Sequence, residues 1–186
     1  MTAGKAVSII LLRGINVGGQ GKLPMKALKA LLEDLGYESV ATYIQSGNVV
    51  LQSGKALGRK DTERITEAIE AAHGFRPAVL VVSLHDLLAC AAANPFPEAG
   101  GKTLHAFFLQ DQPGAPDWPR LEKLRREGEA WELHCGDKCS WLYLHTPGGF
   151  GTSRLPAGIE RALGEPCTAR NWNTVQKLLT MAQSLV

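Results

Sequence analysis

The pattern of hydrophobic and polar positions along the chain predicts alternating strands and helices. Residues 6–13 are apolar on both faces, which favours a strand that is covered on both sides. The leucines that follow Pro24 recur at helical spacing as far as Gly36. The chain therefore opens with a strand and a helix, joined by a glycine-rich segment.

The next stretch has the pattern of a hairpin, a helix and a strand. Two short runs at residues 39–44 and 48–53 flank residues 45–47 at the spacing of a tight turn. A helix capped by Asp61 and an apolar strand at residues 78–82 follow. The first half therefore has the order βαββαβ.

The second half repeats this order. Ser83 and Asp86 have the spacing of a capping box that opens a helix, and the Gly- and Pro-rich residues 94–102 end it. The later elements are expected at residues 104–110, about 118–126, 130–135, 140–145, 156–163 and 166–170. A last helix at residues 174–185 is an addition.

The order βαββαβ, with two helices on one face of a four-stranded sheet, is typical of ferredoxin-like folds. We therefore predict an α+β protein of two ferredoxin-like halves packed as one unit, plus a C-terminal helix. The predicted parts are residues 1–83, a helix and linker at residues 84–102, and residues 103–186. Because strands of both halves are apolar on both faces, we expect the open face of each sheet to be covered.

Composition narrows the class of protein. The 186 residues are 45% hydrophobic and 20% charged, with a formal net charge of +2, so any basic patch must be local. No run reaches the roughly 18 apolar residues of a membrane helix, and the amino terminus lacks a signal-peptide core of about 7 residues or more. We expect a soluble, cytoplasmic protein with no membrane partner.

The cysteines do not form a recognisable framework. Residues 134–139, HCGDKC, contain a pair spaced as in some metal sites, but no second Cys or His pair completes a zinc site. A hairpin turn built on Gly136 and Asp137 explains this stretch. We predict free thiols, no metal and no cofactor; the cysteines are Cys90, Cys135, Cys139 and Cys167.

Four segments resemble an uncharacterised, mainly bacterial family of domains of unknown function. They are RGINVGGQGKLP at residues 13–24, YIQSGNVV at 43–50, GTSRLP at 151–156 and TARNWNTVQKL at 168–178. The resemblance spans nearly the whole chain and implies an α+β fold with ferredoxin-like halves, but no activity. It leads us to expect Lys at position 154, where this chain has Arg.

The glycine-rich segment favours an anion without matching a standard phosphate loop. Gln20 and Gly21 replace the Lys and Ser or Thr of a Walker loop, and Pro24 stands where a dinucleotide motif has its third glycine. What remains is a turn that brings backbone N–H groups to a helix terminus, flanked by Arg13 and Lys22. A simple strand-to-helix turn is the alternative.

The last segment offers two further polar side chains. Asn173 and Gln176 have capping-box spacing, so Asn173 is expected to cap the final helix and Trp172 to anchor it by burial. Arg170 and Asn171 precede this helix and are candidate ligand contacts. The alternative is that the Arg170 side chain donates to a loop carbonyl oxygen and so holds the loop in place.

Several mechanisms are disfavoured by residue type. The four segments contain no Asp or Glu, which argues against paired-carboxylate hydrolysis and carboxylate-bound magnesium there. No nucleophile motif of the type G-x-S-x-G occurs. Trp141, Tyr143 and His145 alternate onto one strand face, where a role in the core is preferred to a base-stacking platform.

We predict that the protein binds a small phosphate- or carboxylate-bearing ligand in a cleft between the halves; no catalytic residue is assigned, and the oligomeric state is not predicted. The alternatives are a nucleic-acid-binding protein that uses the same basic loops, and a protein-interaction module whose motifs are structural. The glycine loop and the first hairpin are expected at opposite ends of the sheet, about 17 to 20 Å apart. The predicted ligand-binding residues are Arg13, Asn16, Gly18, Gly19, Lys22, Arg170 and Asn171.

Overall fold

The computed structural model describes residues 5–19 and 21–186, which form two compact units. The first unit extends to Leu87 and includes Leu178–Val186, and the second is Leu88–Lys177. The end of the C-terminal helix therefore belongs to the first unit. Within the described ranges, no helix has the length and apolar character of a membrane span.

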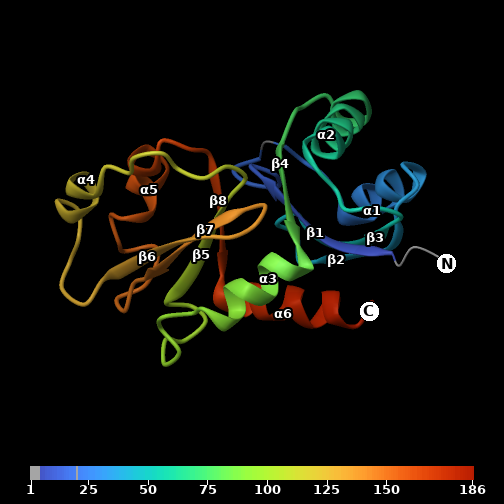
Figure 1. Ribbon diagram of the computed structural model, residues 1–186. Coiled ribbons are helices and arrows are strands. Elements are labelled where there is room, and N and C mark those ends of the chain that lie inside the picture. Colours follow the sequence, from blue (N-terminus) through green and yellow to red (C-terminus); the bar gives the residue numbers. More distant parts are fainter. Residues whose placement is uncertain (1–4, 20) are drawn as a thin grey trace. The chain divides into compact units, whose positions relative to one another are not determined.

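The first unit is a four-stranded antiparallel sheet with two helices on one side (Figure 1). The strand order is β2-β3-β1-β4, and each neighbouring pair is antiparallel. This is the predicted ferredoxin-like arrangement. Its elements are β1 (Ala6–Arg13), α1 (Met25–Asp34), β2 (Glu38–Tyr43), β3 (Asn48–Ser53), α2 (Arg59–His73) and β4 (Ala78–Ser83).

The second unit has the equivalent strand order, β6-β7-β5-β8, again with antiparallel neighbours. The helices α4 and α5 lie on one side of its sheet (Figure 1). The fold class and the repeat of the order βαββαβ are therefore confirmed. The elements are α3 (Leu84–Ala92), β5 (Leu104–Leu109), α4 (Trp118–Glu122), β6 (Ala130–Cys135), β7 (Ser140–His145), α5 (Pro156–Leu163), β8 (Cys167–Asn171) and α6 (Trp172–Gln183), with α3 and α6 each shared between the units.

Alternation along the strands explains where the cores lie. In the second unit, Phe107 of β5 packs under the helices α4 and α5, whereas Tyr143 of β7 points to the opposite face. The Tyr143 ring lies 6.0 Å from the ring of Trp172, and its hydroxyl donates to the backbone oxygen of Cys90 at 2.5 Å. Trp141 and Tyr143 are fully buried, so their predicted core role is confirmed.

The observed ends of the helices agree only in part with those predicted from the sequence. The capping box of Ser83 and Asp86 is present, with the Asp86 N–H donating to Ser83 Oγ at 3.0 Å. The predicted cap of α2 was wrong: the helix begins at Arg59, and the Asp61 carboxylate accepts from the N–H of Gly58 at 3.0 Å. Asp61 therefore stabilises the first turn from inside the helix. In addition, α4 ends at Glu122, earlier than predicted.

Candidate functional site

The glycine-rich segment folds into a closed loop between β1 and α1. The N–H of Asn16 donates to the backbone oxygen of Gly21 at 3.0 Å. Gly21 has a φ of +59°, and a Cβ there would lie 2.7 Å from the oxygen of Gly14, so only glycine fits this position. Gln20, where the segment departs from the Walker pattern, lies outside the described residues. The loop is thus folded back on itself.

The Asn16 side chain fastens this loop to the first hairpin. Its Nδ2 donates to the oxygens of Leu23 at 3.0 Å and Gln45 at 2.8 Å, while its Oδ1 accepts from the N–H of Leu23 at 2.9 Å. Asn16 also has a φ of 53°, a left-handed conformation that Asn tolerates better than most residues. Both polar atoms of the Asn16 side chain therefore form hydrogen bonds that hold the loop and attach it to the hairpin.

These contacts correct the predicted separation of the loop and the hairpin. The helix crossover makes β1 and β2 parallel, and the hairpin then reverses β3, so that β1 and β3 are antiparallel. The end of β1 therefore meets the beginning of β3, and the N–H of Leu12 donates to the oxygen of Gly47 at 2.8 Å. The prediction of about 17 to 20 Å rested on a parallel β1 and β3, and it was wrong.

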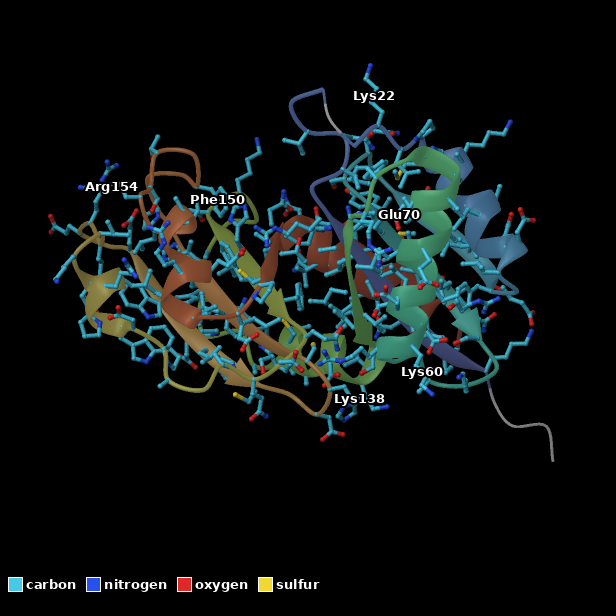
Figure 2. The ribbon with its side chains drawn as sticks, turned by 90° about the horizontal axis from the view of Figure 1, so that it is seen from above. Lys22, Lys60, Glu70, Lys138, Phe150 and Arg154 are labelled. Carbon is cyan, nitrogen blue, oxygen red and sulfur yellow. The ribbon has the colours of Figure 1, made fainter. Side chains whose placement is uncertain are left out.

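The remaining predicted residues of the first unit lie on the surface of this loop. Arg13, Gly18, Gly19 and Lys22 are exposed, and Figure 2 shows Lys22 pointing away from the ribbon. In the hairpin, Asn48 is fully buried and its Nδ2 donates to the oxygen of Tyr43 at 3.1 Å, which is a structural role. Arg13 and Lys22 are thus cations at the two ends of a loop that is held internally.

Arg170 and Asn171 belong to the second unit, where both bond within the chain. Arg170 is 8% exposed, and its Nη1 donates to Thr168 Oγ1 and to the oxygen of Ala169, both at 2.8 Å. Burial lowers the pKa of Arg170 to about 10, so that the guanidinium stays charged at neutral pH. This arginine lies inside the protein beside the strand β8.

The cap of the final helix is Asn171. Its Oδ1 accepts from the N–H of Thr174 at 2.9 Å, and α6 begins at Trp172. The prediction that Asn173 caps this helix was wrong, because the helix begins earlier than residue 174. Trp172 is 6% exposed, which confirms its predicted burial.

A hollow that the sequence did not reveal lies between α4 and α5, within the second unit. We call it the basic hollow, with a volume of about 690 Å³. Its floor is close-packed: a Cβ at Gly158 would lie 2.6 Å from Leu124 Cδ1, and the N–H of Asp117 donates to the oxygen of Ala162 at 2.7 Å. The lining residues are Asp117, Arg120, Lys123, Leu124, Arg154, Ala157, Gly158 and Arg161.

The charges around the basic hollow are unbalanced. Arg120, Lys123, Arg154 and Arg161 are exposed, and their side chains form no ion pair with any residue that the structure describes. The one carboxylate in the lining, that of Asp117, accepts from the N–H of Arg120 at 3.1 Å and caps α4. Figure 2 shows Arg154 at the surface of its unit. The hollow therefore presents four cations to solvent.

Sequence reasoning missed this hollow because its cations come from two separate segments. Arg120 and Lys123 lie in and just after α4, while Arg154 and Arg161 bracket the first turns of α5. Arg120 and Lys123 are three residues apart, which places them on one face of the α4 turn, whereas Arg154 precedes the first residue of α5. Only the packing of α4 against α5 brings the two segments together. Of the four, Arg154 alone lies in a segment that was singled out.

Cys90, one of the buried cysteines, is a poor nucleophile. Cys90 is fully buried, and burial raises the pKa of its thiol to about 12. The thiol is therefore protonated at neutral pH. Cys135 is exposed at the end of β6, and the hairpin predicted for residues 134–139 is present, with the Gly136 N–H donating to the oxygen of Cys139 at 3.0 Å.

The fold and the basic hollow together define a class: an α+β protein with two ferredoxin-like sheets, one of which carries a cluster of unpaired cations. The chain belongs to the family DUF1697, proteins of unknown function, whose model matches residues 6–140. No curated protein matches it.

Two solved structures are similar to this chain. The conserved bacterial protein SP0830 from Streptococcus pneumoniae is 25% identical, with a TM-score of 0.65, over 96% of this chain and 99% of that one. This match supports the fold over the whole length. An unknown protein from Galdieria sulphuraria is 12% identical over 98% of this chain and 92% of that one, with a TM-score of 0.25, which carries no structural argument.

Proposed function

We propose that this protein binds a small phosphate- or carboxylate-bearing ligand in the basic hollow of the second unit. The observation that carries the proposal is the cluster of four unpaired cations around a hollow of about 690 Å³. Ligand sites of proteins commonly have volumes of about 300 to 1,000 Å³. The hollow is thus large enough for a sugar phosphate or a nucleotide.

Electrostatics favours an anion over a neutral ligand at this place. Like charges that share a hollow repel one another, and an anion among them relieves this repulsion while it accepts charge-assisted hydrogen bonds. Ala157 and Gly158 add the first turn of α5, where the helix dipole is positive and no side chain caps the helix. Arginine, which supplies three of the four cations, suits phosphate and carboxylate groups because its donors form a planar fork.

The proposal keeps the predicted ligand class and moves its site. In the glycine loop, the Asn16 side chain is used internally, and Arg170 and Asn171 hold the junction of β8 and α6. The predicted cleft between the halves stays a prediction. The basic hollow contains one carboxylate, which serves as a helix cap, so the proposal covers binding and assigns no reaction.

The test is a calorimetric titration with pyrophosphate of the wild-type chain and of Arg154→Gln combined with Arg161→Gln. We expect the double variant to lose about tenfold or more in affinity, since about 1.4 kcal/mol accompanies each factor of ten. A matched control with the same change of charge is Lys55→Gln combined with Lys60→Gln, two exposed lysines of the first unit. Its affinity should stay within about twofold of the wild type, because neither lysine lines the basic hollow and both are exposed to solvent, where salt screens their charge.

Salt dependence separates this proposal from nucleic-acid binding. Binding through several phosphates of a strand loses orders of magnitude in affinity between about 50 and 200 mM salt, whereas a single small anion loses much less. The proposal fails if the wild type binds no pyrophosphate, or if the double variant and the control bind it equally well.

A further inference from the structure

The strand β6 is the most exposed of the edge strands, which are β2, β4, β6 and β8 (Figure 1). The strands β2, β4 and β8 each contain at least one buried residue, whereas every residue of β6 is exposed or half-buried. An edge strand presents a row of backbone N–H and C=O groups to whatever lies beside it. The edge of β6 is therefore accessible to a further strand.

The backbone groups of alternate residues in β6 point away from the sheet. The N–H of Gly136 donates to the oxygen of Cys139 at 3.0 Å, which makes these two residues a hydrogen-bonded pair of the hairpin. Bonded and non-bonded pairs alternate along an antiparallel ladder, so the next bonded residues of β6 are His134, Glu132 and Ala130. The residues whose N–H and C=O groups point outward, where the described sheet has no strand, are Trp131, Leu133 and Cys135.

The strand that holds the same place in the first unit, β2, has an irregular edge. Its register with β3 shifts between Glu38 and Ala41, and Ser39 has a φ of 52°. A bulge of this kind twists an edge strand and interrupts its row of outward groups. The ladder of β6 with β7 runs without a shift from Ala130 to Cys135. The edge of β6 is therefore regular enough to pair with another strand.

A hollow beside β6 leaves room for an added strand. It has a volume of about 610 Å³, and residues 130–133 of β6 line it together with Trp118, Glu122 and Arg125. Trp131 and Glu132 point to opposite faces of the sheet, yet both line the hollow, so the hollow reaches the outer edge of the strand. The Trp131 ring is half-buried. A strand added at this edge would remove apolar surface of that ring from water.

The side chains of β6 favour a second copy of the same strand as the partner. When two β6 strands pair antiparallel about a two-fold axis at Leu133, the outward groups of Trp131 in each copy meet those of Cys135 in the other. This register gives about six backbone hydrogen bonds. It also sets Glu132 of each copy opposite His134 of the other, an acid beside a base. A shift by one residue of the axis sets Glu132 opposite Glu132, or His134 opposite His134, and brings like groups together.

His134 is held in place for such a contact. Its ring stacks on Trp141 with centroids 6.2 Å apart, and lies edge-on to the ring of Tyr143 at 5.3 Å. Its Nε2 lies 2.5 Å from Glu132 Oε1 of the same chain, whereas its Nδ1 forms no hydrogen bond within the described chain. Both ring nitrogens donate in the imidazolium form, and a carboxylate has about four acceptor positions. His134 can therefore bridge the Glu132 carboxylates of two copies.

We propose that this protein forms a homodimer in which the β6 strands of two copies pair antiparallel about Leu133 and join two sheets into one. The backbone of the edge supplies the hydrogen bonds, and the contacts between Glu132 and His134 fix the register. The proposal does not depend on anion binding, because no residue that lines the basic hollow lies on β6.

The first test is sedimentation velocity over a range of protein concentrations. We expect the wild type to dimerise reversibly, and Glu132→Lys and His134→Glu each to weaken the dimer about tenfold or more, because each replaces an acid–base pair by two bases or two acids. An equimolar mixture of the two variants should restore the dimer, since the mixed pair again sets an acid opposite a base at both places. The matched control is Glu67→Lys, an exposed residue of α2, which should stay within about twofold of the wild type.

Hydrogen exchange tests the same pairing in the wild type without any substitution. As the protein concentration rises, the amides of Trp131, Leu133 and Cys135 should become protected, because they gain acceptors in the other copy. The amides of Glu132 and His134 are bonded to β7 in both states, so their exchange should change little. This alternation along one strand distinguishes pairing at the edge from association through another surface.

The outcomes are decisive in either direction. A wild type that stays monomeric at every concentration overturns the proposal. Dimers that persist unchanged in Glu132→Lys and His134→Glu, or that a mixture of the folded variants does not restore, overturn the pairing through β6. Tryptophan fluorescence shows whether each variant is folded. If either variant is unfolded, hydrogen exchange of the wild type decides alone, and equal exchange of the three outward amides at low and high concentration overturns the proposal.

Discussion

The strands β1 and β5 hold equivalent central places in the two sheets. The helices that cover the two sheets differ in length and in whether they leave a hollow between them. In the first unit, α1 and α2 have 10 and 15 residues, and cations on them or near their ends form ion pairs, as Lys29 does with Glu33 and Arg76 with Glu63 and Glu70. In the second unit, α4 and α5 have 5 and 8 residues and leave the basic hollow between them.

This difference shows that a repeated topology does not repeat a site. In the first unit, polar groups near the end of the central strand bind the loop to the hairpin, whereas in the second unit four cations in or beside the short helices face solvent. The same strand order thus supports a rigid loop in one unit and a proposed binding site in the other, so function has to be argued from the side chains. Substitutions in the two units should accordingly have different kinds of effect.

The largest effect is expected for Gly47→Ala in the first unit. A Cβ at Gly47 would lie 2.6 Å from Leu12 Cβ and 2.8 Å from Ile15 Cδ1, and the residue has a φ of +73°. Left-handed strain and overpacking together should lower the free energy of unfolding by about 3 kcal/mol. Urea unfolding followed by far-UV circular dichroism measures the loss.

The control is Gly54→Ala, where a Cβ meets no atom within 4 Å and φ is not in the left-handed region. Its effect should stay within about 0.5 kcal/mol. All four tryptophans lie between residues 118 and 172, in the second unit, so tryptophan fluorescence follows that unit alone. Equal losses for the two glycine variants would show that Gly47 has no special role.

An intermediate loss of stability is expected for Asn16→Ala in the first unit. Arg154→Ala in the second unit serves as the comparison. The first removes three hydrogen bonds and leaves the N–H and oxygen of Leu23 without this partner, at a cost of about 2 kcal/mol. The second removes an exposed, unpaired cation and should change stability by less than about 0.5 kcal/mol while weakening pyrophosphate binding. Urea unfolding and calorimetry on both variants give the comparison, and a reversed order of stability losses would contradict it.

Much of the fold could be predicted from local patterns in the sequence. Strand and helix periods gave the order βαββαβ in both halves, and the capping box of Ser83 and Asp86 is local in sequence. The positions of Asn16 and Gln45 could not be found in this way, since their contact depends on the direction of β3 relative to β1. A correct application of the hairpin rule, by which β3 reverses β2, would have placed them together.

The basic hollow depends on packing between segments that are distant in sequence. Arg120 and Arg154 are separated by β6, β7 and the loops around them, and the packing of α4 against α5, as between Leu124 and Gly158, brings their segments together. The helical spacing of Arg120 and Lys123 was visible, but nothing local pairs one helix with the other. The anion class was predicted from the glycine loop and the segment before the last helix, whereas the structure offers four cations in or beside α4 and α5.

The smallest change in the free energy of unfolding at neutral pH is expected for His105→Val. The difference from the wild type should grow as the pH is lowered. His105 lies on β5 two residues before Phe107 and four before Leu109, on the face of the sheet that packs against α4 and α5. The His105 ring stacks on Phe150 with centroids 3.9 Å apart, and its Nδ1 is buried with no hydrogen-bond partner in the described chain. Burial lowers the pKa of His105 from 6.5 to about 4.

The sign of the pH dependence follows from this lowered pKa. Between about pH 6.5 and pH 4 the unfolded chain takes up a proton on His105 that the folded chain does not, so stability falls as the pH is lowered through this range. Above about pH 6.5 the histidine is neutral in both states and contributes no slope. His105→Val, which removes this titrating ring and keeps a residue that favours strands, should therefore unfold at a urea midpoint that changes less between pH 7 and pH 4.5 than that of the wild type. Tryptophan fluorescence provides the readout, since it reports on the second unit. Identical pH profiles for the two chains would show that the ring of His105 titrates as it does in the unfolded chain.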